Sequence, residues 1–162
     1  MRPVTTYTTN TYRGKYTPQN PQKYRGDIHN IFYRSSWEFY FMRWCDLRSS
    51  VLEWGSEEVI VPYINPFDHE QHRYFVDFYV KVKTSTGTKK YWVEVKPFRF
   101  TQEPTPQKRK TKQFINEVIQ WGVNKAKWDA ASKYAARCGV EFLLLTENEL
   151  GLNPFKKKKG TP

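Results

Sequence analysis

Hydrophobic and polar residues alternate along two neighbouring stretches in the middle of the chain, 74–82 and 91–95. Both stretches are rich in β-branched and aromatic residues, and a period of two is typical of strands with one buried face. Thr86 and Gly87 lie between them and are residue types that favour a tight turn. The pattern therefore predicts a β-hairpin within residues 74–97.

The segment before the hairpin predicts a helix followed by extended chain. Residues 35–48 place apolar side chains at helical spacing, and Ser35 with Glu38 forms the S-x-x-E capping box of a helix start. Residues 51–64 predict a short strand, a turn and a second extended run. Because Pro62 lacks a backbone donor, this run is expected at the edge of a sheet.

The segment after the hairpin predicts a loop, an interrupted helix and a last strand. Helical spacing runs through 111–121 and again through 124–138, with Gly122 between them and Gly139 as the C-terminal cap. The apolar run 140–146 has the length of a strand and is expected to be a buried central one. The order α-β-β-β-α-β predicts an α/β fold with a mixed central sheet flanked by helices.

The hairpin gathers charged side chains on one face. Alternation places Val76 and Phe78 on one face of the first strand, whereas Asp77 shares the other face with Glu94 and Lys96 of the second strand. A turn centred on the Thr-Gly pair sets Asp77 opposite Lys96, and a turn one residue earlier sets it opposite Glu94. In either register the three charged side chains are neighbours.

Two interpretations fit these charges. The plainer one is a cross-strand ion pair on a solvated face. The sharper one is a divalent-metal site, since two close carboxylates repel each other unless a cation lies between them. Mg²⁺ favours one or two carboxylates together with phosphate oxygens, and Mn²⁺ is the alternative ion. A lysine beside such a site would stabilise charge that develops during attack on a phosphodiester.

Charge and length indicate the partner and the domain organisation. The 162 residues carry a net charge of +11, which indicates a polyanionic partner such as nucleic acid. Residues 1–33 predict a basic extended arm, 34–150 a single domain, and 151–162 a lysine-rich tail. The arm either follows a phosphate backbone or packs against the domain. The two cysteines are interpreted as reduced thiols, and no apolar run has the length of a membrane span.

Basic and aromatic residues near the hairpin are candidate contacts to DNA. Two of them directly precede the first strand, three lie in the loop after the second strand, and one lies near the start of the later helix. They are Arg73, Tyr74, Lys108, Arg109, Lys110 and Lys127. A further run, Trp54 with Ser56 and Glu57, is interpreted either as a core residue followed by a turn or as lining of the cleft beside Asp77.

The spacing of Asp77 and Glu94-Val95-Lys96 resembles the D…E-x-K core of the PD-(D/E)XK nuclease superfamily, with Val76 at the position of its proline. The run 34–38, Arg-Ser-Ser-Trp-Glu, resembles the helix start of TnsA-like nucleases and, closely, that of the head-completion nucleases of T-even-type tailed phages. Further runs add to this second resemblance, which covers about residues 33–150. They are Trp-x-Ser-Glu at 54–57, His-Arg-Tyr-Phe-x-Asp-Phe at 72–78, Glu-x-Lys-Pro at 94–97 and Leu-Leu-Thr-Glu at 144–147.

The resemblance implies a restriction-endonuclease-like fold and a Mg²⁺-dependent deoxyribonuclease. It implies that Asp77, Glu94 and the Val95 carbonyl hold the metal and that Lys96 orients the attacking water. Glu38, from the helix before the sheet, would complete the acidic site. Glu38 is also the capping residue of that helix, and one side chain can serve both purposes.

The resemblance also implies a role in finishing the DNA-filled capsid, with trimming of packaged DNA ends as the suggested task. The expected partners are DNA and the portal or other neck proteins, and the expected location is the host cytoplasm during assembly, or the virion. An alternative is a DNA-binding structural head-completion protein whose nuclease-like scaffold does not cleave. A third is a transposase-type end nuclease that requires a partner subunit.

Overall fold

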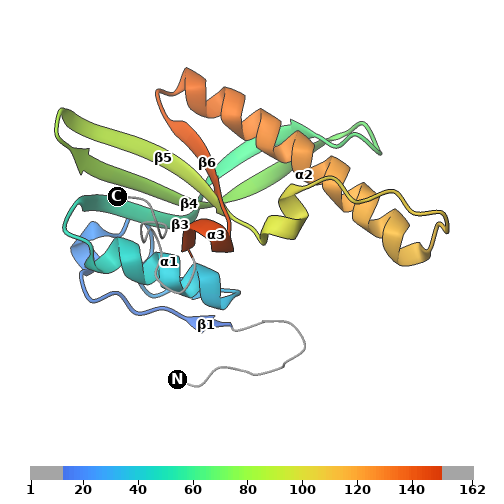
Figure 1. The fold of residues 1–162 in the computed structure, drawn as a ribbon. Coiled ribbons are helices and arrows are strands. Elements are labelled where there is room, and N and C mark those ends of the chain that lie inside the picture. Colours follow the sequence, from blue (N-terminus) through green and yellow to red (C-terminus); the bar gives the residue numbers. More distant parts are fainter. Residues whose placement is uncertain (1–12, 151–162) are drawn as a thin grey trace.

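The computed structural model describes residues 13–150 (Figure 1). The predicted tail at 151–162 and residues 1–12 of the predicted arm lie outside the described residues. The main elements follow the order α-β-β-β-α-β, which confirms the predicted α/β core. None of the helices within residues 13–150 is long and apolar enough to cross a membrane.

A four-stranded mixed sheet forms the centre of the fold. Its strands lie in the order β3 (Val51–Ile64), β4 (Gln71–Thr84), β5 (Gly87–Val95) and β6 (Glu141–Leu145). The first three are antiparallel neighbours, whereas β6 runs parallel to β5. The mixed sheet is therefore confirmed, and β3 lies at the edge that Pro62 indicated.

Two long helices cover opposite faces of the sheet (Figure 1). The helix α1 (Ser36–Leu47) packs on one face and α2 (Lys112–Arg137) on the other. The shorter elements are β1 (Gly14–Lys15), the 3-10 helix η1 (Pro21–Lys23), β2 (Phe32–Tyr33), the 3-10 helix η2 (Phe98–Thr101) and α3 (Glu147–Leu150). The sheet is thus the middle of three layers.

The last strand, β6, lies at an edge of the sheet and not at its centre, contrary to the prediction. Its apolar run has another cause. Leu143 and Leu145 face the core beneath α1, whereas Phe142 and Leu144 face the core beneath α2. Because a helix covers each face, the successive side chains from Phe142 to Leu145 are all apolar.

Residues 51–64 form one continuous strand instead of the predicted strand, turn and second run. The predicted turn is a β-bulge. At the bulge β3 has one more residue than β4, so two residues, Glu57 and Glu58, lie opposite the single residue Asp77. The φ angle of Glu57 is 56°. A bulge bends and twists its strand without ending the ladder, which explains why the polar run does not break β3.

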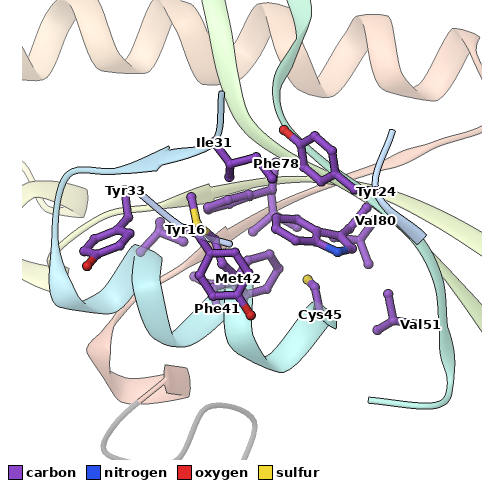
Figure 2. Close-up of a cluster of buried hydrophobic side chains, with 14 of the residues drawn as sticks. Tyr16, Tyr24, Ile31, Tyr33, Phe41, Met42, Cys45, Val51, Phe78 and Val80 are labelled. Atoms are coloured by element: carbon purple, nitrogen blue, oxygen red, sulfur yellow. The ribbon is translucent and has the colours of Figure 1, made fainter. Parts of the chain in front are cut away.

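Two hydrophobic cores meet at Asp77. Figure 2 shows the first core, in which Phe41 and Met42 of α1 pack with Phe78 of β4. The second core lies beneath α2 and contains Val76. Val76 and Phe78 were expected on one face, but the twist at the bulge assigns them to different cores. Asp77, between them, lies where β4 passes from one core to the other.

The helix α2 is one helix, whereas the sequence predicted two segments interrupted at Gly122. An isolated glycine weakens a helix by about 1 kcal/mol without ending it. The glycine has a packing reason: a Cβ at Gly122 would lie 2.9 Å from the ring of Phe67. The loop between β3 and β4 therefore packs directly on the backbone of α2. Gly139, with φ 72°, caps the helix end as predicted.

Residues 13–33 pack against the domain, so the described part of the predicted arm is an extended segment and not a separate unit. Its buried side chains are Tyr16, Tyr24, Ile31 and Tyr33, and all four belong to the first core. This is the second of the two possibilities that the sequence left open. The tyrosines supply the apolar area that the segment needs in order to be held.

A buried carboxylate at the end of α1 fastens this segment. Asp46 is fully buried, and its oxygens accept hydrogen bonds from the Tyr16 hydroxyl at 2.6 Å and from the N–H groups of Gln19 and Asn20 at 2.7 and 2.9 Å. Lys23 donates to the Asp46 carbonyl at 3.0 Å. The chain leading into α1 is therefore fixed to the helix that it precedes.

Candidate active site

The two strand carboxylates lie side by side in the structure. The hairpin pairs Phe78 with Val93, and one step further along this register Asp77 faces Glu94. This is the register set by the earlier of the two turns considered. Asp77 is 8% exposed and Glu94 is 6% exposed, so the charged face is buried and not solvated. A solvated surface ion pair is therefore excluded as the explanation of these charges.

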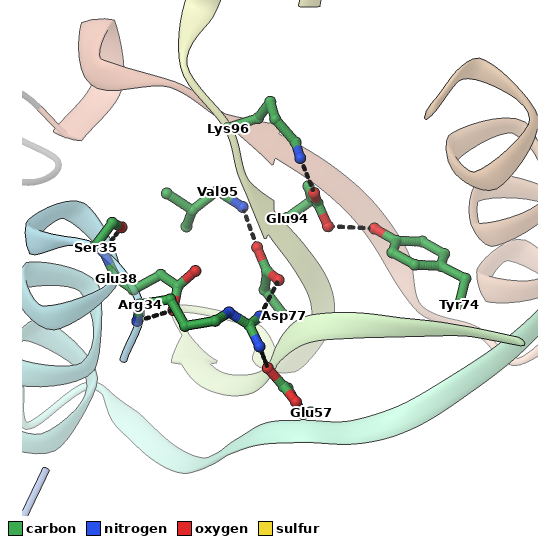
Figure 3. Close-up of polar contacts among 9 residues, drawn as sticks. All are labelled: Arg34, Ser35, Glu38, Glu57, Tyr74, Asp77, Glu94, Val95 and Lys96. Carbon is green, nitrogen blue, oxygen red and sulfur yellow. Dashed lines mark hydrogen bonds and ion pairs between the residues drawn. The ribbon is translucent and has the colours of Figure 1, made fainter. Parts of the chain in front are cut away.

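Each carboxylate is held by the surrounding backbone and side chains (Figure 3). The Val95 N–H donates to Asp77 Oδ2 at 2.9 Å. The Tyr74 hydroxyl donates to Glu94 Oε1 at 2.5 Å, and Lys96 Nζ lies 3.2 Å from Glu94 Oε2. The E-x-K spacing thus places Lys96 in an ion pair with Glu94, while the backbone N–H of Val95 orients Asp77.

Glu38 reaches the same place from the first turn of α1. The Ser35 hydroxyl accepts the Glu38 N–H at 3.1 Å, which confirms the predicted cap, and Glu38 Oε1 accepts the Arg34 N–H at 2.9 Å. Figure 3 shows its side chain pointing toward Asp77. The structure therefore brings together the four residues expected in catalysis, Glu38, Asp77, Glu94 and Lys96.

Arg34 and Glu57 also belong to this cluster. Arg34 lies 2.6 Å from Glu57 Oε2 and 3.8 Å from Asp77 Oδ1. Sequence reasoning offered Glu57 only as a possible lining residue and gave Arg34 no separate role. The signal that points to both is the polar run at the bulge, because bulges re-aim side chains near functional sites.

Burial and mutual repulsion favour the protonated form of the carboxyl groups in this cluster. Burial, the neighbouring Glu94 and then Glu38 raise the pKa of the Asp77 carboxyl well above its usual value. Burial also raises the pKa of Glu38, although the nearby Arg34 opposes this effect. A carboxyl shifted in this direction gains from any cation that approaches it.

The donor set suits a hard divalent cation. The available groups are carboxylate and backbone oxygens, which Mg²⁺ and Mn²⁺ prefer. Within residues 13–150, no three His, Cys, Asp or Glu side chains lie close enough to form a ready metal cluster. Asp77 and Glu94 are the two strand carboxylates that would hold the ion, and this number matches Mg²⁺, which keeps several waters and takes substrate oxygens.

The raised pKa of Asp77 predicts that Asp77→Asn stabilises the metal-free protein. The folded state keeps this proton to a higher pH than the unfolded state, so unfolding free energy falls as pH rises above about 4. The asparagine carries no charge and still accepts the Val95 N–H. We expect Asp77→Asn to melt at a higher temperature than the wild type at pH 8, and the two to differ little at pH 4. Thermal unfolding in EDTA at both pH values measures the difference.

The exposed Asp129→Asn variant is the control for this comparison, because it removes the same charge from the surface of α2. Its melting temperature should follow that of the wild type at both pH values. An Asp77→Asn protein that is less stable than the wild type at pH 8 would contradict the electrostatic account.

The expected DNA contacts near the strands occupy different environments. Arg73 is exposed and stacks over the Phe75 ring at 5.5 Å. Tyr74 is buried and its hydroxyl is bound to Glu94, so it holds that carboxylate and is not available to a phosphate. Lys127 lies 5.5 Å over the Tyr74 ring, and burial lowers the pKa of its ammonium group.

The remaining basic candidates lie together in the loop that leads to α2. Lys108, Arg109 and Lys110 are all exposed. The same connection follows directly from the end of β5, and with the first half of α2 it borders a groove lined by Arg99 and Lys112. The expected basic loop is thus a solvent-facing continuation of the strand that carries Glu94.

Comparisons with known proteins agree with this geometry. A family model described as "TnsA-like endonuclease N terminal" matches residues 48–147. The "Head completion nuclease" of Enterobacteria phage T4 is 40% identical over 149 residues, which cover 90% of this chain and 97% of the relative. No solved structure gives a significant match. The matched range contains Asp77, Glu94 and Lys96, and the chain belongs to the TnsA-like endonuclease family, with its restriction-endonuclease-like fold.

Proposed function

We propose that this protein is a metal-dependent DNA nuclease that hydrolyses phosphodiester bonds during phage head completion. One observation carries the proposal: Asp77 and Glu94 face each other in a buried site, with Lys96 Nζ 3.2 Å from Glu94. Burial of two carboxylates on adjacent strands is costly unless they serve a cation. The family to which the chain belongs supports the nuclease chemistry.

Each residue has a distinct role in the proposal. Asp77, Glu94 and the Val95 carbonyl would hold the cation, which would supply Lewis acidity toward the phosphate and the attacking water. Lys96 orients that water and stabilises the negative charge that develops. Glu38 completes the acidic site from α1. Tyr74 keeps the Glu94 carboxylate in place through its hydrogen bond.

DNA is held by charge, without readout of sequence. Lys108, Arg109 and Lys110 follow the strand that carries Glu94, Arg73 is exposed on β4, and Lys127 lies over the Tyr74 ring beside the buried site. Phosphate contacts of this kind position a duplex but do not distinguish its bases. The net charge of +11 supports the same role.

The assignment to head completion rests on the similar protein of phage T4, which carries that name and is covered almost completely by this chain. Trimming of packaged DNA ends is the proposed task. The proposed partners are the portal or other neck proteins, which this protein would meet in the host cytoplasm during assembly.

Metal removal tests the proposed activity. We expect the purified protein to cleave linear or branched DNA in Mg²⁺ or Mn²⁺, and EDTA to abolish cleavage until Mg²⁺ is restored. Gel analysis of end-labelled DNA measures the products. Salt-sensitive DNA binding without cleavage in either ion would instead support the alternative, a structural head-completion protein with a nuclease-like scaffold.

A further inference from the structure

Arg34 lies among three carboxylates at the mouth of the site (Figure 3). Its guanidinium is 2.6 Å from Glu57 and 3.8 Å from Asp77, and its own backbone N–H donates to Glu38 at 2.9 Å. The backbone bond fixes the start of the side chain, while the guanidinium extends across to the strands. Arg34 is therefore placed as a positive charge beside the carboxylate expected to bind the metal.

Glu57 owes its position to an uncommon backbone conformation. Its φ of 56° lies in the left-handed region, which residues other than glycine enter at a cost. The bulge at this point sets Glu57 and Glu58 against Asp77 alone. Strain of this kind persists where the surrounding structure imposes it, and it often marks functional sites.

The two ion pairs of Arg34 are unequal. The short contact is with Glu57, whereas the contact with Asp77 is 1.2 Å longer, from 3.8 Å and 2.6 Å. Asp77 Oδ2 is already bound to the Val95 N–H, so Oδ1 is the oxygen that faces Arg34. A guanidinium drawn fully onto Oδ1 would oppose the approach of a second cation through charge repulsion.

We infer that Arg34 is an internal counter-ion of the carboxylate site and that Glu57 holds it away from Asp77, so that a divalent cation can reach Asp77. The inference rests on the proposed metal-dependent function. Arg34 neutralises the cluster in the absence of the metal, and it competes with the metal for Asp77. Glu57 lessens that competition because it binds the guanidinium more closely.

Exposure of the pair allows this exchange. The side chains of Arg34 and Glu57 are 55% and 36% exposed, whereas that of Asp77 is 11% exposed. A partly exposed ion pair is weak and can open and close readily. Arg34 can therefore shift between its two acidic partners without unfolding α1 or β3.

Metal affinity of the full chain, measured without DNA, tests the inference. Isothermal calorimetry gives the Kd of Mg²⁺, with Mn²⁺ as a second ion, for the wild type, Arg34→Gln, Glu57→Gln and the double variant. We expect Arg34→Gln to lower Kd by about threefold to tenfold, because a competing charge is lost. Glu57→Gln should raise Kd by a similar factor, because Arg34 is then left to Asp77.

The double variant separates the counter-ion from a simple charge effect. If Glu57 acts through Arg34, adding Glu57→Gln to Arg34→Gln changes Kd less than twofold. If Glu57→Gln raises Kd by the same factor in the wild type and in Arg34→Gln, Glu57 acts by its own charge and the inference is overturned. Arg34→Lys keeps the positive charge at this position and should leave Kd within about twofold of the wild type.

Arg25 and Glu53 provide a matched control, because this ion pair also joins the N-terminal segment to β3. Arg25→Gln and Glu53→Gln should leave Kd unchanged. If the wild type binds the ion but Arg34→Gln has an unchanged or raised Kd, the inference is overturned, whereas the proposed metal dependence stands. A wild type that binds neither ion overturns both the inference and the proposed metal dependence.

Discussion

Lys96→Met is expected to lower the rate of DNA cleavage by about 10²–10⁴-fold, the range typical of a lost acid–base or charge-stabilising group. Methionine preserves much of the length and apolar stem of lysine but removes the ammonium group that lies 3.2 Å from Glu94. Single-turnover cleavage of end-labelled DNA in Mg²⁺ measures the chemical step. DNA affinity should change by less than about threefold, because one of 27 basic residues is removed.

Lys89→Met is the matched control for this substitution. Lys89 lies on β5, the strand that ends just before Lys96; it is exposed and pairs with Glu141, which is not one of the site's carboxylates. We expect this variant to cleave at the wild-type rate. A Lys96→Met protein that cleaves as fast as the control would remove Lys96 from the reaction and leave it as a counter-charge of Glu94.

Asp46→Ala is expected to destabilise the protein by about 3 kcal/mol or more, although Asp46 takes no part in the proposed chemistry. The substitution leaves the buried Tyr16 hydroxyl and two partly buried backbone N–H groups without their acceptor. A buried group that loses its partner costs about 1–3 kcal/mol. Such a loss is a large share of the stability of a small domain. Urea unfolding followed by tryptophan fluorescence measures the difference.

Tyr16→Phe removes only one of these hydrogen bonds and should cost about 1–2 kcal/mol. Asp129→Ala, on the exposed surface of α2, should remain within about 0.5 kcal/mol of the wild type. If Asp46→Ala matches Asp129→Ala, the contacts of Asp46 do not hold the segment 16–23 in place.

The hairpin and its charged face were predictable because local pattern determines them. Alternation over 74–82 and 91–95 specified two strands, and a one-residue slip would have exposed the valines of the core. The cap formed by Ser35 and Glu38 could also be predicted, since capping is a contact between residues at most four positions apart. These local features placed Asp77, Glu94 and Lys96 on one face of the hairpin, whereas Glu38 was added to the site by the resemblance to TnsA-like nucleases.

Other features were hidden because they depend on contacts between distant segments. The bulge at Glu57 arises from the pairing of β3 with β4, and a polar run reads equally well as a turn. From the sequence alone Gly122 resembles a helix break. The structure shows that the glycine instead makes room for the ring of Phe67 against the helix. The burial of Tyr74 depends on α2, so its hydroxyl could not be assigned to Glu94 in advance.

The N-terminal segment shows the same limitation. Its composition, basic and rich in tyrosine, is typical of an arm that contacts a polyanion. Its place on the domain is decided by Asp46, which lies 30 residues beyond Tyr16 and carries no signal of its own in the pattern of α1. Long-range anchors of this kind are visible only once the helix and the segment are placed together.

The most direct test of the central claim compares DNA cleavage in Mg²⁺ by Glu94→Gln and by the wild type. DNA binding is measured on the same samples. The glutamine keeps an oxygen for the Tyr74 hydroxyl and removes the charge beside Lys96. We predict that the wild type cleaves DNA only in the presence of the divalent ion, and that Glu94→Gln binds DNA with nearly unchanged affinity but does not cleave it. Cleavage by Glu94→Gln at the wild-type rate would contradict the assignment of this site.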